Sequence, residues 1–177
     1  MKIAVFGKPG GGKSTLSLQI AAATKQPLYQ LDLVQYRLGG SKVPDEEFLR
    51  RHAEIMAQEQ WVVDGFGNPQ AFATMLHAAD VLVYVERFSL IHYCWVTKRL
   101  LKSPFSKPLG WPEGSPMLSS TISSYRFLRR SPKFWNSAFK AKLLALRPGK
   151  RVYVVRKQSD VGALLAELSS WRPNGEA

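Results

Sequence analysis

A glycine-rich segment close to the N-terminus constrains the fold of this chain more than any other feature. The pattern G-x-x-x-x-G-K-S/T is satisfied at every fixed position by Gly7-Lys8-Pro9-Gly10-Gly11-Gly12-Lys13-Ser14. A short apolar run at residues 2–6 precedes the segment, and residues 14–24 follow it with apolar side chains at helical spacing. A strand, a glycine loop and a helix in this order predict a phosphate-binding loop, whose backbone N–H groups and helix N-terminus face the phosphates.

Such a loop predicts a site for a nucleoside triphosphate, ATP or GTP, together with Mg2+. We expect Lys13 to bridge the terminal phosphates and Ser14 to ligate the metal ion. The residues expected to bind nucleotide are Gly7, Lys8, Pro9, Gly10, Gly11, Gly12, Lys13, Ser14 and Thr15.

Apolar runs recur along the chain and alternate with helical patterns. Further strand candidates lie at residues 28–31, 61–63, 81–85 and 151–155. Their residues are nearly all apolar, which is typical of strands covered on both faces. Acidic residues at 45–47 mark the start of one intervening helix, which we expect to reach residue 59 or 60. The alternation predicts a three-layer α/β sandwich of about five parallel strands, and the length of 177 residues fits one domain, 1–177.

Two acidic residues stand where strand candidates end. Asp64 follows the run at 61–63, and Asp32 follows the run at 28–31. Because the carboxyl ends of strands in such sheets line the ligand crevice, we expect Asp64 to orient Mg2+. Asp32 is placed to meet the metal ion or a phosphate acceptor, with capping of the next turn as an equal alternative.

The net charge of +12 is concentrated in one part of the chain. Residues 87–151 hold 14 lysines and arginines but a single acidic residue, Glu113. This basic segment needs an anionic partner, and nucleotide phosphates, a nucleic acid and a membrane surface are all compatible with it. Aromatic residues among the cations, such as Trp111, Tyr125 and Trp135, also suit stacking on bases.

Part of the basic segment is predicted to form a lid. Four prolines at 104, 108, 112 and 116 exclude a regular element there. Arg126, Arg129 and Arg130 then fall on one face of a predicted helix, and a further helix is expected at residues 133–146. We therefore expect residues 103–132 to be a lid-like insertion whose arginines, with Arg99 from the preceding helix, contact the transferring phosphate.

Other features bear on cellular location. The N-terminal apolar run is too short for a signal-peptide core, and no run approaches the ~18 apolar residues of a membrane-spanning helix. Cys94 is the only cysteine, which favours a reducing compartment. These features predict a cytoplasmic protein that does not enter the membrane.

The loop, the acid after the second strand, the segment Val62-Val63-Asp64-Gly65-Phe66 and the later arginines together resemble the adenylate-kinase-like branch of P-loop kinases. Within that branch the chain is most similar to bacterial proteins known as DNA topology modulation proteins or adenylate-kinase-related ATPases, from Met1 to about Leu168. The resemblance implies five parallel strands, an aspartate at Asp64 that helps to organise Mg2+, and a lid before the last strand. Adenylate kinases continue the Asp-Gly-Phe segment with a proline and an AMP-binding arginine, whereas this chain has Gly67-Asn68-Pro69.

Three functions fit these observations. The first is an ATP-dependent phosphotransferase acting on a nucleotide or another small acceptor. The second is a nucleic-acid-associated ATPase or DNA topology-modulating protein that uses the basic segment. The third is a regulatory nucleotide switch without phosphoryl transfer.

Overall fold

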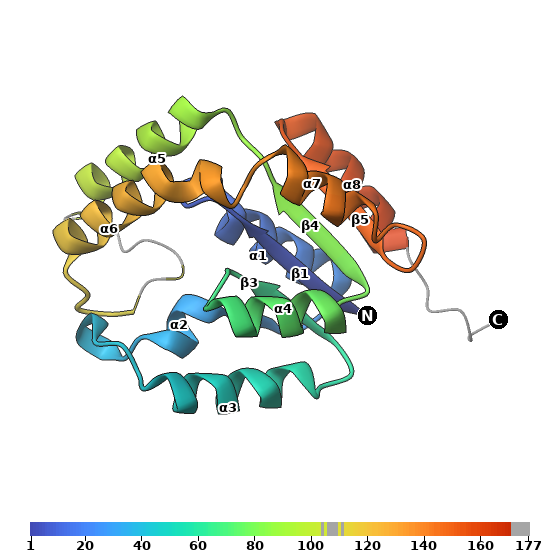
Figure 1. Cartoon of the computed structure of the whole chain (residues 1–177), viewed down its shortest axis with the longest axis horizontal. Helices are drawn as coiled ribbons and strands as arrows, with labels where there is room; N and C mark the ends of the chain where they lie inside the picture. The colour runs from blue at the N-terminus through green and yellow to red at the C-terminus, as the bar shows by residue number, and fades with distance from the viewer. Residues whose placement is uncertain (104, 106–109, 111, 171–177) are drawn as a thin grey trace.

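A computed structural model describes residues 1–103, 105, 110 and 112–170. In this part of the chain a single parallel sheet has the strand order β2-β3-β1-β4-β5 (Figure 1). The strands are β1 (Lys2–Gly7), β2 (Leu28–Gln30), β3 (Trp61–Asp64), β4 (Val81–Val85) and β5 (Arg151–Val155). The predicted α/β fold with five parallel strands is confirmed.

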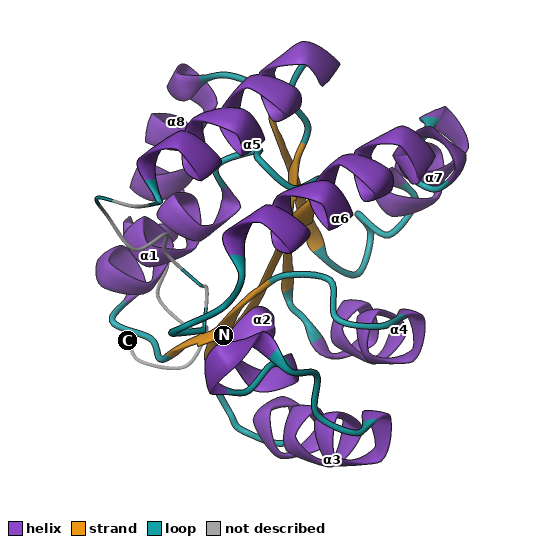
Figure 2. Cartoon of the chain, turned by 90° about the vertical axis from the view of Figure 1, so that its left-hand side faces the viewer, coloured by secondary structure: helices purple, strands orange, loops and turns teal. Residues whose placement is uncertain are grey.

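Helices cover both faces of the sheet, as Figures 1 and 2 show from two directions. Their bounds are α1 (Lys13–Thr24), α2 (Leu31–Gln35), α3 (Asp45–Met56), α4 (Pro69–Ala78), α5 (Ser89–Lys102), α6 (Met117–Arg130), α7 (Ser137–Leu144) and α8 (Gln158–Ser170). Helices α1 and α8 pack on one face, and α3, α4 and α7 supply apolar residues to the other. Helices α5 and α6 lie side by side beyond the carboxyl ends of the strands.

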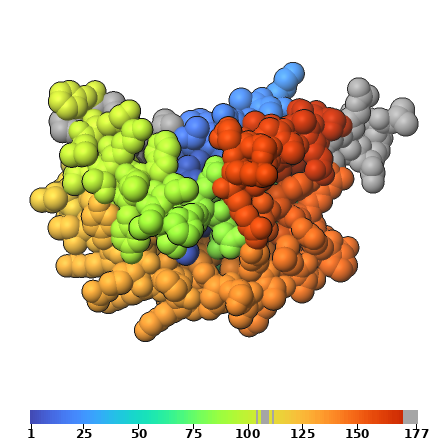
Figure 3. Space-filling model, turned by 90° about the horizontal axis from the view of Figure 1, so that it is seen from above, coloured from blue at the N-terminus to red at the C-terminus, as the bar shows by residue number. Residues whose placement is uncertain are grey.

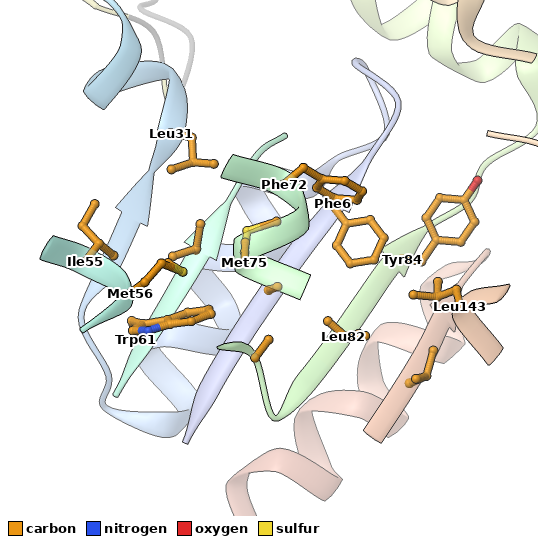
Figure 4. Close-up of a cluster of buried hydrophobic side chains, with 14 of the residues drawn as sticks. Phe6, Leu31, Ile55, Met56, Trp61, Phe72, Met75, Leu82, Tyr84 and Leu143 are labelled. Atoms are coloured by element: carbon orange, nitrogen blue, oxygen red, sulfur yellow. The ribbon is translucent and has the colours of Figure 1, made fainter. Parts of the chain in front are cut away.

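Side chains of β1 alternate between two hydrophobic clusters because successive residues of a strand point to opposite faces. Phe6 belongs to the cluster beneath α4, where it meets Phe72 edge-on and stacks near Tyr84 (Figure 4). Ile3 and Val5 belong to the cluster beneath α1 and α8. Burial on both faces explains why the strands contain almost no polar residues.

Several helix ends are set by local sequence. Asn68 caps α4 by accepting a hydrogen bond from the backbone N–H of Ala71, and Pro69 occupies the first helical position. The predicted helix at 133–146 begins later, at Ser137, because Asn136 caps it and the residues before it form a short 3-10 turn, Ser131–Lys133. The helix that starts at Asp45 ends at Met56, a turn earlier than expected.

Two further boundaries concern predicted functional segments. Strand β2 ends at Gln30 and α2 begins at once, so Asp32 lies in the first turn of α2 rather than at the end of a strand. In the predicted lid, residues 104, 106–109 and 111, including Trp111, lie outside the described residues. The rest of that segment contains α6, which packs along α5.

Candidate active site

The sheet brings three functional segments to one edge. Val5 is opposite Asp64 in the pairing of β1 with β3, and Gln30 is opposite Asp64 in the pairing of β2 with β3. The glycine loop leaves β1 directly after Gly7, at the same edge. Strand register therefore places Gln30 and Asp64 beside the start of the loop.

The loop has the backbone conformation that its glycines permit. The φ angles of Gly10 and Gly12 are +72° and +84°, in the left-handed region that favours glycine. Lys13 opens helix α1, and its Nζ donates a hydrogen bond of 3.0 Å to the backbone carbonyl of Lys8. The lysine side chain thus folds back over the loop, as a group that grips phosphates there requires.

A cavity of about 670 Å³ opens over the loop. It receives Lys13 and Ser14 from α1, Asp32 from α2, Asp64 from β3 and Arg99 from α5. Of the predicted loop residues, those that line it are Gly7, Pro9, Gly10, Gly12, Lys13, Ser14 and Thr15. The structure thus brings the predicted loop, both acids and Arg99 into one site.

The charged groups of this cavity perturb one another. Burial lowers the pKa of the Lys13 ammonium, whereas Asp64 and Asp32 nearby favour its charged form. Removal from bulk water raises the pKa of Asp32, although its side chain borders the open cavity, and Asp64 raises that pKa further. Lys13 and Arg99 oppose this rise. Two acids and two cations within interaction range form a coupled charge cluster of the kind found in active sites.

The surroundings of Asp64 fit a metal ion. Burial raises the pKa of its carboxyl, whereas Lys13 and the side chains of Ser14 and Gln30 lower it. Oδ1 of Asp64 is buried and has no hydrogen-bond partner among the described residues. In the described part of the chain, no three His, Cys, Asp or Glu side chains come together in a way that could hold a metal ion. Asp64 and Ser14 both line the cavity, and their oxygen atoms are of the kind that Mg2+ prefers as ligands.

The predicted arginines separate into two groups. Arg99 lines the cavity, and its Nη2 donates a hydrogen bond of 3.1 Å to Oγ of Ser124 on α6. Burial lowers the pKa of Arg99, and Asp32 opposes this effect. Arg126, Arg129 and Arg130 are exposed and do not line the cavity. The structure does not bring these three arginines to the loop, so their contact with phosphates stays a prediction.

Helix α6 instead presents small hydroxyl side chains to the cavity. Ser120, Ser123 and Ser124 line it together with Phe127. The buried side of the helix carries Thr121, Ser124 and Leu128. The three arginines lie C-terminal to these serines, in the last turns of α6, where they are exposed to solvent.

Several lining residues escaped the sequence reasoning. Gln30 is the last residue of β2, just as Asp64 is the last residue of β3. The reasoning that pointed to Asp64, a polar residue at the end of a strand, could therefore also have pointed to Gln30. Trp95, Lys98 and Lys102 share one stripe of α5 with Arg99, at the spacing i, i+3, i+4, i+7. The Nζ of Lys98 lies 5.0 Å from the centre of the Trp95 ring. The helical spacing could therefore have identified Trp95, Lys98 and Lys102 from the sequence.

Several aromatic rings of the basic segment pack against other aromatic rings. Trp135 is buried in the cluster that contains Phe6. Tyr125 stacks on Tyr93, and Phe127 contacts Phe66 edge-on. These contacts occupy the rings of Trp135, Tyr125 and Phe127, whereas the side chains of Phe88, Trp95, Phe105 and Phe134 are exposed. In the described ranges, the helices are too short or too polar to cross a membrane.

The fold and the loop define a P-loop α/β domain, and comparisons place it among kinase structures. No family model matches the chain, and no curated protein matches it either. A sugar kinase from a Janibacter species has 15% sequence identity and a TM-score of 0.51, with 96% of this chain and 92% of that chain covered. Shikimate kinase from Acinetobacter baumannii, solved with shikimate, has 15% identity and a TM-score of 0.55, with coverage of 94% and 89%. The chain therefore has the fold of P-loop kinases.

Proposed function

We propose that this protein is an ATP- or GTP-dependent phosphotransferase that acts on a small acceptor. The observation that carries the proposal is the convergence of Lys13, Asp32, Asp64 and Arg99 on one cavity over the phosphate-binding loop. A loop that only held nucleotide would not need the second acid, Asp32, or the arginine on α5. The sugar and shikimate kinases of the same fold support this class of reaction.

Each residue has a role that follows from its position. Lys13 and the loop N–H groups hold the phosphates, and Arg99 supplies a planar cation for charge that develops on the transferring group. Ser14 and Asp64 would hold Mg2+, which when bound neutralises phosphate charge. Asp32 has a raised pKa and faces the cavity, so it can orient an acceptor hydroxyl and accept its proton. Catalysis then consists of positioning and charge stabilisation.

The same cavity is also lined by residues outside the loop that could hold the acceptor. Gln35 and Tyr36 follow Asp32 in the chain and line its wall. The hydroxyls of Ser120 and Ser123 are also available there, together with the ring of Phe66. Amide, hydroxyl and aromatic groups in this number favour a small polar compound that carries several hydroxyls.

A lid over this cavity remains part of the proposal. Gly110, within the predicted lid, lines the cavity. A Cβ atom on Gly110 would lie 3.0 Å from Nε2 of Gln30 and 3.5 Å from Oγ of Ser14. Closure of the segment at 103–132 over bound nucleotide would exclude water, which a kinase needs in order to avoid hydrolysis. Hydrogen exchange with and without an ATP analogue and Mg2+ tests this motion.

Consumption of ATP tests the function directly. The acceptor panel contains neutral polyols, hydroxy acids, nucleoside monophosphates and DNA, and Lys13→Ala is assayed beside the wild type. We expect one class of small acceptor to stimulate turnover and Lys13→Ala to abolish it. Lys142→Ala is the matched control, because Lys142 is an exposed lysine of α7 outside the cavity lining. Turnover that ignores every small acceptor would refute a phosphotransferase.

The second candidate, a nucleic-acid-associated ATPase related to DNA topology modulation, is tested by the same panel. The concentration of basic residues at 87–151 favours it. The packing of Trp135 and Tyr125 speaks against base stacking by these two rings. Stimulation by DNA alone, with an affinity that falls steeply as salt rises, would replace the kinase with this function.

A further inference from the structure

His92 lies directly behind the phosphate-binding loop. It is in the first turns of α5 and its side chain is fully buried. The space-filling view in Figure 3 shows α5 (lime green) on the surface, with blue atoms of the N-terminal part of the chain visible between it and the red C-terminal helix. Helix α5 contacts the loop through His92, as the distances to Pro9, Gly10 and Gly11 show.

The contacts between His92 and the loop are close. Its Nδ1 lies 2.8 Å from the backbone carbonyl oxygen of Pro9. A carbonyl can only accept, so Nδ1 carries the hydrogen and donates it. A Cβ atom on Gly10 would lie 2.5 Å from the His92 carbonyl oxygen, and one on Gly11 would lie 3.2 Å from His92 Cε1. The first turn of the loop thus packs closely against His92.

The same helix reaches the other side of the site. Trp95, Lys98, Arg99 and Lys102 follow His92 on α5, and all four line the cavity. Helix α5 therefore contacts the outer side of the loop through His92 and presents cations to the cavity through the next two turns. The position of the loop relative to Arg99 depends on how firmly α5 and the loop are joined.

We propose that His92 is a positioning residue, which by donating from Nδ1 to the Pro9 carbonyl fixes the phosphate-binding loop against the helix that carries Arg99. This role rests on the proposed nucleotide site but not on the identity of the acceptor. It also explains why a polar side chain is buried at this point of α5. The loop carbonyl of Pro9 would otherwise face an apolar contact without a hydrogen-bond donor.

Nucleotide binding then becomes linked to protonation of the imidazole at Nε2. Burial lowers the pKa of His92, and the nearby cations Lys8 and Lys13 lower it further. Hydrogen bonding to the backbone at Pro9 and Arg87 has the opposite effect and raises this pKa. Bound phosphates would offset the two lysine charges and so raise this pKa. Between the pKa values of the free and the nucleotide-bound protein, binding should take up a proton from solvent onto Nε2 while Nδ1 keeps its hydrogen bond.

Two substitutions separate the hydrogen bond from the ring. His92→Leu removes the donor at similar size, whereas the amide nitrogen of His92→Asn can occupy the position of Nδ1. His52→Asn is the matched control, because His52 on α3 is also buried and also has a lowered pKa, without contact to the loop. Calorimetry with an ATP analogue and Mg2+ gives the affinity, and titration in two buffers of different ionisation enthalpy gives the proton uptake.

We expect His92→Leu to weaken nucleotide binding about tenfold and His92→Asn to stay within about threefold of wild type. Both variants should lose the proton uptake near pH 6, and His52→Asn should keep it. Wild-type affinity in His92→Leu, or equal losses in the two variants, would overturn the proposal. If His92→Leu does not fold, His92→Asn decides: it must bind well and take up no proton. A wild-type protein that binds no nucleotide refutes the proposed function instead.

Discussion

Two glycines of the loop provide a matched pair of alanine substitutions. Gly10 and Gly12 both have left-handed backbone, but their surroundings differ. A Cβ on Gly10 would lie 2.5 Å from the carbonyl oxygen of His92 and 3.0 Å from Cγ2 of Val96. A Cβ on Gly12 would meet no described atom within 4 Å. The comparison therefore isolates the contact between the loop and α5.

The free energies of unfolding follow from these two environments. Left-handed backbone costs a residue with a Cβ about 1–2 kcal/mol, and this cost applies to both variants. Only Gly10→Ala must also displace a backbone carbonyl of α5, and overpacking of this kind adds about 1–3 kcal/mol. We therefore expect a loss of about 1–2 kcal/mol for Gly12→Ala and about 2–5 kcal/mol for Gly10→Ala.

Urea unfolding without nucleotide measures both losses, so that effects on phosphate binding do not enter. Each kcal/mol should lower the melting temperature by about 2–4 °C for a domain of this size. The dependence of the free energy on urea should be unchanged, because neither variant alters the surface exposed on unfolding. Equal destabilisation of the two variants would show that α5 does not press on the loop as described.

Three further predictions concern the charged groups. Asp64→Asn should lower turnover about 10–100-fold with little loss of nucleotide affinity, and wild-type turnover across a Mg2+ titration would contradict its role at the metal. Arg99→Gln should lower turnover about a hundredfold, and wild-type turnover in this variant would contradict a role of Arg99 at the transferring phosphate. Burial lowers the pKa of His52, so the unfolded chain takes up a proton that the folded chain does not, and stability should fall as the pH drops below 6.5. Urea unfolding at about pH 7.5 and about pH 5.5 tests this, and His52→Asn should reduce the difference.

Much of the fold could be predicted because the strands of a parallel sheet that is buried on both faces are visible in the sequence as apolar runs. The run at 81–85 matches β4 residue for residue, because the charged residues Asp80 and Glu86 mark its two ends. Asp64 was identified as a candidate for the same reason, because a polar residue after such a run marks the edge of the sheet. Asp32 lines the same cavity, although a helix rather than a strand holds it.

The far wall of the cavity could not be predicted in the same way. On α6, Ser123, Arg126 and Arg130 have the spacing i, i+3, i+7 and follow one another along one side, so periodicity does not show which of them reach the cavity. A cavity that binds a polar ligand is lined by polar groups, so its wall resembles a solvent-facing surface in sequence. Charge pointed to Arg126 as a residue of the site, whereas Ser123 lines the cavity in the structure.

The order of the elements along the chain bears on how this protein is made. The helix that follows the loop buries Leu16 and Ile20 in a cluster completed by Leu164 and Leu168 of α8. During translation, the loop and α1 leave the ribosome before α8, which follows more than a hundred residues later. The apolar side of α1 is left without that cover until then. The nascent chain thus carries the groups of the site before it has the packing that holds α1 in place.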